Sequence, residues 1–176
     1  SEKERLEKRL REVVRELEKL NEDLDRRLEE LARDLERLNE ESRRESRKLA
    51  EDLKREVKDD EELLEKVKRI IDEDRRLNDE DHKLIRDIIR RAKELLEEDH
   101  KRIREIIKRA KELIDRGGDR VEEVEERIER LIRDLKRHTE EIKKTIEELM
   151  KELREHSREI IKRSRDLFKE LKDTTK

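Results

Sequence analysis

The chain has 176 residues, of which 61% are charged and 29% hydrophobic, and its 52 basic and 55 acidic residues leave a net charge of −3. The near balance of the two signs argues against a disordered chain, which usually carries high net charge. The sequence has no run of about 18 apolar residues, which is the length needed to span a membrane. It also has no stripe of basic residues that could bind nucleic acid. A composition rich in Glu, Lys, Arg and Leu with helical periodicity predicts long helices instead.

Disulfide and thiol chemistry are excluded by the residue types present, and the redox compartment stays undetermined. Cys, Pro, Trp, Tyr and Gln are absent, and Phe168 is the only aromatic residue. Without cysteine there is no disulfide framework and no thiolate nucleophile. No signal peptide or lipidation motif is visible, so we expect a soluble chain without a membrane anchor.

A first helix is expected over about residues 2–57. Its apolar positions recur at spacings of 3, 4, 3, 4 and 4, which make 18 residues in five turns: Leu10, Val13, Leu17, Leu20, Leu24, Leu28, Leu31, Leu35 and Leu38. This period of 3.6 residues per turn is that of an unstrained helix, so the helix should be nearly straight. Ser1 and Glu4 have the spacing of a capping box at its start.

A second helix is expected over about residues 60–116. Its second half is internally repeated, since DHKLIRDIIRRAKELLEE at 81–98 is followed by DHKRIREIIKRAKELIDR at 99–116. Asp59 and Glu62 predict a capping box at its start, and Gly117-Gly118 predicts its end. Because neither Gly nor Pro interrupts the chain near Asp59, one continuous helix of about 115 residues is the structural alternative.

A third helix is expected over about residues 120–174, with a capping box at Asp119 and Glu122. In an antiparallel helix pair, residues at the same height have residue numbers with a constant sum, and half of that sum gives the position of the turn. Pairing Asn21 with His100 and Asn39 with His82 places the first turn near residue 60, and pairing His100 with His138 and His82 with His156 places the second at 119. We therefore predict an all-α fold: a single-chain antiparallel (up-down-up) three-helix bundle of long, nearly straight helices, forming one domain over residues 1–176.

Polar residues inside or at the edge of the predicted apolar arcs form three layers, with Asp81 and Asp99 well inside and the four histidines at the edge. The first contains Asn21, Asp99, His100, His138 and Thr139. The second contains Asn39, Asp81, His82, His156 and Ser157. The third contains Ser42, Ser46, Asp74, Asn78 and Ser164. A buried polar group without a partner costs about 1–3 kcal/mol, so each layer is expected to be a hydrogen-bonded network. Such networks would also fix the register of the helices.

The chain resembles computationally designed helical bundles with buried hydrogen-bond networks. The resemblance rests on the 18-residue repeat, the three capping boxes, the DRGGD connection, the missing residue types and the layered Asn, His, Ser and Thr sets, and it covers the whole chain. The predicted buried histidines are similar to those of designed pH-responsive bundles. The resemblance implies a synthetic protein with no natural localisation, which would stay in the cytosol on recombinant expression.

The expected function is that of a designed structural scaffold whose polar layers specify its fold, and not that of an enzyme. Two alternatives stay open. The first is a pH-responsive switch that protonation of buried histidines destabilises. The second is a component of a larger helical assembly, either a homo-oligomer or a bundle completed by designed partner helices. We expect a monomer that requires no partner and binds neither nucleic acid nor membrane.

No catalytic, cofactor-binding or metal-binding residue is predicted. Two histidines and one aspartate share each of the first two layers, and such a set can hold a divalent metal. However, no two histidines lie three or four residues apart on one helix, so the metal signal is weak. No Ser or Cys nucleophile lies in a loop beside an oxyanion donor.

Overall fold

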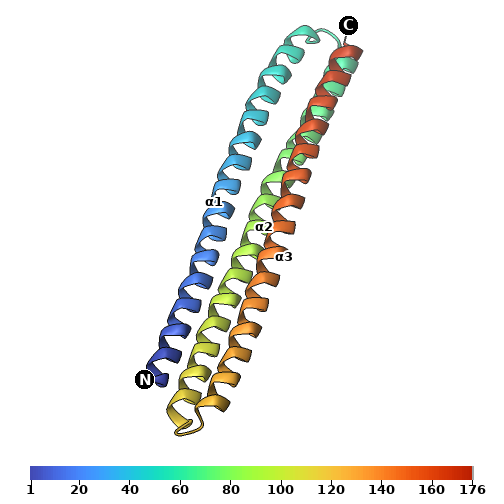
Figure 1. The fold of residues 1–176 in the computed structure, drawn as a ribbon. Coiled ribbons are helices and arrows are strands. Elements are labelled where there is room, and N and C mark those ends of the chain that lie inside the picture. Colours follow the sequence, from blue (N-terminus) through green and yellow to red (C-terminus); the bar gives the residue numbers. More distant parts are fainter. Residues whose placement is uncertain (176) are drawn as a thin grey trace. The chain divides into compact units, whose positions relative to one another are not determined.

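The computed structural model describes residues 1–175, which form three α-helices and no strand (Figure 1). The helices are α1 (Glu2–Glu56), α2 (Glu61–Arg116) and α3 (Val121–Thr174). Each helix contacts the other two, and consecutive helices are antiparallel. This confirms the predicted all-α three-helix fold.

Residues 57–60 form the first connection and are not helical, so the alternative of one continuous helix of about 115 residues is wrong. The Leu63 amide donates to Asp60 Oδ1 at 3.2 Å, and the Leu64 amide donates to the Asp60 carbonyl at 2.9 Å. Asp60 is therefore the N-cap of α2. The predicted capping box of Asp59 and Glu62 is wrong by one residue.

The second connection depends on two glycines. Gly118 has a φ of 53°, in the left-handed region that glycine adopts without strain. A Cβ on Gly117 would lie 2.3 Å from Val124 Cγ2, so the close approach of α3 requires glycine there as well. Because the Arg120 carbonyl accepts from the Val124 amide, Arg120 and not Asp119 occupies the N-cap of α3.

At the start of α1 the predicted cap is confirmed. The Glu4 amide donates to Ser1 Oγ at 3.4 Å, and the Glu4 carboxylate lies 3.9 Å from the amino group of Ser1. These are the two reciprocal contacts of a capping box.

The chain divides into two compact units, and each helix contributes a segment to both. Unit 1 contains residues 1–28 and 90–149, and unit 2 contains residues 29–89 and 150–175. The expectation of one domain over residues 1–176 stays a prediction.

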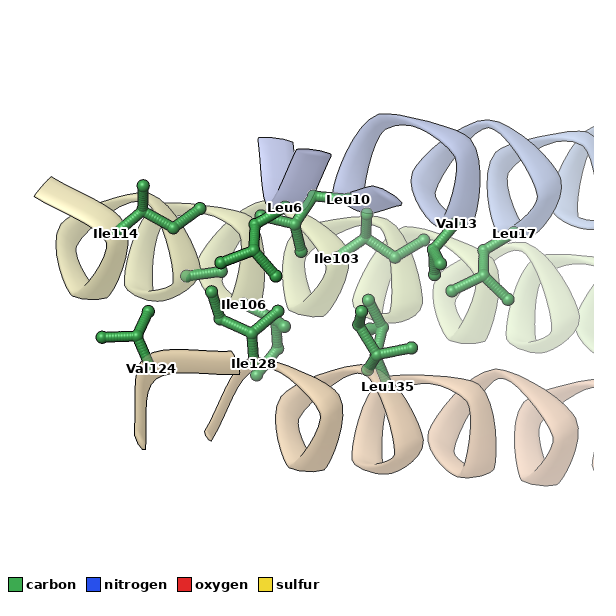
Figure 2. Close-up of a cluster of buried hydrophobic side chains, with 12 residues drawn as sticks. Leu6, Leu10, Val13, Leu17, Ile103, Ile106, Ile114, Val124, Ile128 and Leu135 are labelled. Carbon is green, nitrogen blue, oxygen red and sulfur yellow. The ribbon is translucent and has the colours of Figure 1, made fainter. Parts of the chain in front are cut away.

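Unit 1 has an aliphatic core to which all three helices contribute. Figure 2 shows leucines of α1 facing isoleucines of α2 and α3. Ala110 and Ile128 have no exposed surface. Ion pairs join α1 to α3 at a constant offset of 120 residues, at Arg5–Glu125 and Arg9–Glu129. These two helices therefore run parallel in unit 1.

Unit 2 has its own core, which includes the only aromatic side chain of the sequence. Phe168 and Leu171 of α3 pack with Val67 of α2 and with Ala50 and Leu53 of α1. Val67 has no exposed surface and Phe168 is 4% exposed.

Candidate functional site

The first predicted layer forms a network around Asp99 of α2, which has no exposed surface. Asn21 Nδ2 of α1 donates to Asp99 Oδ2 at 2.8 Å. From α3, Thr139 Oγ1 donates from 2.9 Å to Oδ2 and lies 3.1 Å from Oδ1, and His138 Nδ1 lies 2.7 Å from Oδ1. Asp99 thus connects all three helices of unit 1.

The second layer repeats this plan in unit 2 with fewer partners. Asp81 of α2 also has no exposed surface. Asn39 Nδ2 of α1 donates to its Oδ2 at 2.9 Å, and Ser157 Oγ of α3 donates to its Oδ1 at 2.8 Å. Asn39 also donates to the Asn78 carbonyl at 3.3 Å.

The third layer is centred on Asp74 of α2, which is 4% exposed. Ser164 Oγ of α3 donates to Asp74 Oδ1, and Asn78 Nδ2 donates to Oδ2 at 3.2 Å. Ser46 Oγ of α1 lies 3.3 Å from Ser164 Oγ and completes the connection between the helices. Ser42 is buried beside this layer at 6% exposure, without a side-chain hydrogen bond among those found.

Three of the four histidines are placed differently from the prediction. His82 Nδ1 lies 2.8 Å from Glu36 Oε2, and His100 Nδ1 lies 3.4 Å from Glu18 Oε1, so both rings bridge α1 and α2 outside the buried networks. His156 is exposed, so its assignment to a buried layer is wrong. Only His138, with 28% of its side chain exposed, reaches a buried aspartate.

The physical reason is the position of these histidines at the edge of the apolar arc. A ring at that position can turn inward to a buried aspartate or outward to water and surface carboxylates, and helical periodicity does not distinguish the two rotamers. Likewise, Asn21 and Asn39 bind Asp99 and Asp81 and not the histidines with which they were paired.

Sequence reasoning missed the two glutamates that bind these histidines. Glu18 and Glu36 are 18 residues apart, as are His100 and His82. The repeat therefore contained a signal for two equivalent Glu–His pairs, each at the height of its neighbouring network.

Burial raises the pKa of Asp81 above its usual value, because desolvation disfavours the carboxylate. Hydrogen bonds from Asn39 and Ser157 oppose this effect, while the negative charge of Glu36 adds to it and His82 lowers it. The hydrogen-bond partners of Asp81 are Asn39 and Ser157, whereas Asp99 also has the His138 ring at 2.7 Å from its Oδ1.

The three networks connect the helices within each unit through hydrogen bonds to buried carboxylates. The buried hydroxyls of Thr139, Ser157 and Ser164 all donate to carboxylates, and no histidine contacts them as a base. No group of three or more His, Cys, Asp or Glu residues in this range could hold a metal ion. Within the same range, no helix is long and apolar enough to cross a membrane.

Comparison with protein-family models, with curated proteins and with solved structures found no match to this chain.

Proposed function

We propose that this chain is a designed structural scaffold without a natural biochemical activity, in which buried aspartate-centred networks specify how the helices pair. The observation that carries the proposal is the common plan of the three networks. Asp99, Asp81 and Asp74 all lie on α2, and each is connected through hydrogen bonds to both α1 and α3.

Such a plan makes incorrect helix pairing costly. Sliding a helix by one residue turns its side chains by about 100° around its axis, because a helix has 3.6 residues per turn. Each aspartate would then lose its donors, and a buried charge without partners costs about 3–5 kcal/mol. Apolar side chains discriminate less, since leucine packs acceptably against many neighbours.

A switch that opens when buried histidines are protonated is less well supported. His82, His100 and His138 each contact a carboxylate, which attracts a protonated ring. His156 is exposed and needs no desolvation. Protonation therefore does not by itself separate these helices.

The test removes one network as a unit. A variant with Asn21→Leu, Asp99→Leu, His138→Leu and Thr139→Val replaces the Asp99 network by apolar side chains. Its unfolding free energy should equal or exceed that of the parent, because buried charges are often replaced by apolar groups without loss. Its amide NMR spectrum should show broad or multiple signals, whereas the parent should show one set of signals and, in light scattering, a single species of the chain mass of 21.8 kDa.

The matched control changes a surface pair at the same height, with Glu18→Ala and His100→Ala. It should retain one sharp set of amide signals. A network-free variant with one equally sharp set and the parent's mass would show that the network does not specify the fold.

A further inference from the structure

Unit 1 has an open groove of about 430 Å³ between α2 and α3. Leu113 of α2 and Leu131 of α3 form its apolar bottom. Both side chains pack against the core of unit 1, yet both are only half-buried. No residue of α1 lines this groove. Besides the face that α1 covers, the α2–α3 pair of unit 1 therefore has a second apolar strip that no helix of residues 1–175 covers.

The edges of the groove carry more positive than negative charge. The polar lining consists of four arginines and two carboxylates: Arg109, Arg116, Arg127, Arg130, Glu112 and Asp134. Asp134 is already paired with Arg137, whose guanidinium lies 3.2 Å from its Oδ1. Within residues 1–175, none of the four groove arginines takes part in an ion pair or a hydrogen bond. Both α2 and α3 thus present unpaired guanidinium groups beside the apolar strip.

The face that α1 covers shows how charges are arranged where a helix does lie on α2 and α3 in this unit. Arg5 of α1 pairs with Glu125 of α3 at 2.9 Å, and Lys3 of α1 pairs with Asp115 of α2 at 3.2 Å. A helix packed on these two helices therefore matches charges of opposite sign on both of them. Because the other groove presents arginines, the residues that match it on a helix are Glu and Asp.

From this contrast we infer that the groove is a docking site for an acidic amphipathic helix of a partner chain. Leucines on one face of that helix cover Leu113 and Leu131, which is the usual way in which an amphipathic helix binds an apolar groove. Glutamates beside those leucines pair with the groove arginines, because the fork of guanidinium N–H donors suits a carboxylate. A second copy of this chain docked through the same groove would place arginines against arginines, and repulsion between like charges disfavours that pairing.

Titration of the full ¹⁵N-labelled chain with a synthetic peptide at pH 7, followed by NMR, tests this site. The peptide is an amphipathic helix of about 18 residues, or five turns, with leucine on one face and glutamate on both edges of that face. Saturable shifts are expected at the amides of Leu113 and Leu131. Two matched peptides should bind at least about tenfold more weakly, because one has lysine in place of each glutamate and the other has glutamine in place of each leucine.

Reversal of two groove charges locates the site. In the variant with Arg109→Glu and Arg130→Glu, both at exposed positions, the glutamate peptide should bind at least about tenfold more weakly than to the parent. The lysine peptide should bind this variant more tightly than it binds the parent, because glutamates then face its lysines. The matched control has Arg11→Glu and Arg15→Glu, which lie exposed on α1 in unit 1, outside the groove, and change the net charge equally. It should bind the glutamate peptide within about twofold of the parent at a salt concentration where the screening length is about 8 Å.

Several outcomes would overturn the inference. The first is equal binding of the glutamate and lysine peptides, and the second is the absence of saturable shifts at the groove. The third is an equal loss of binding in the Arg11→Glu, Arg15→Glu control, with helicity verified by circular dichroism, since net charge alone would then attract the peptide. The fourth is a dimer of the chain by itself in light scattering that Arg109→Glu and Arg130→Glu convert to a monomer, which would assign the groove to a second copy. All of these outcomes leave the scaffold proposal unaffected, because no variant changes a network residue.

Discussion

Asp99 and Asp81 occupy equivalent positions of the 18-residue repeat, yet their surroundings differ by one histidine. Asp99 has the His138 ring at 2.7 Å, whereas the equivalent His156 is exposed and leaves Asp81 with two neutral donors. The central place of the aspartates was predictable, because their position on the helical wheel lies well inside the apolar arc. The choice between the two histidines was not, since both lie at the edge of that arc.

This difference predicts unequal effects of two equivalent substitutions. His138→Ala removes a partner of a fully buried carboxylate and should lower the unfolding free energy by about 1–3 kcal/mol. His156→Ala removes an exposed ring and should change it by less than about 0.5 kcal/mol. Urea unfolding at pH 7, followed by circular dichroism, measures both. Equal effects would mean that the His138–Asp99 contact contributes nothing.

The raised pKa of Asp81 predicts how Asp81→Asn depends on pH. A carboxyl whose pKa is higher in the folded state than in the unfolded state stabilises the fold below its unfolded value, and this contribution disappears as the pH rises through the folded value. Asparagine has no such dependence. The unfolding free energy of Asp81→Asn minus that of the parent should therefore increase as the pH rises from acidic values to 7. The increase should be about 1.4 kcal/mol for each unit by which folding raises the pKa of Asp81.

Urea unfolding at pH 3, 5 and 7 checks this sign. Asp52→Asn, at an exposed position of unit 2, is the matched control and should show little change relative to the parent. A relative stability of Asp81→Asn that falls as the pH rises would contradict the burial argument.

At the scale of the helices, sequence patterns located the ends of α1, α2 and α3 to within one residue. They misplaced the caps of α2 and α3 by one residue, because the capping-box spacing favoured Asp59 over the adjacent Asp60 and favoured Asp119 over Arg120, whose side chain is not one that N-caps prefer. In the structure Asp60 and Arg120 hold the cap positions. Backbone geometry decides between such neighbours, since only one residue combines an extended conformation with a carbonyl that accepts the first helical hydrogen bond.

The adjacent aspartates of the first connection allow a direct comparison. Asp60→Ala removes the acceptor of the Leu63 amide and should lower the unfolding free energy by about 1 kcal/mol. Asp59→Ala, one residue earlier and exposed, should change it by less than about 0.5 kcal/mol. Thermal and urea unfolding measure the difference. A larger loss of unfolding free energy for Asp59→Ala than for Asp60→Ala would mean that Asp59, as the sequence pattern predicted, is the N-cap of α2.

For the molecule as a whole, the sequence predicted a three-helix fold and three polar layers from one principle. Periodicity places polar residues in an arc, and constant residue sums place them at a common height. The 18-residue repeat relates the Glu36–His82 and Glu18–His100 pairs to each other. It does not identify them by itself, because each histidine at the surface has several carboxylates nearby.

The central claim is that the networks set the register of the helices, and a distance between two helices of unit 1 tests it most directly. The sequence contains no cysteine, so spin labels at Glu16→Cys on α1 and Lys136→Cys on α3, both exposed, report only on this pair. Double electron–electron resonance should give one narrow distance distribution in the parent and in the control variant with Glu18→Ala and His100→Ala. With the Asp99 network replaced by Leu and Val the distribution should broaden or split. An unchanged narrow distribution in that variant would contradict the claim and assign the register to the short connections and the apolar core.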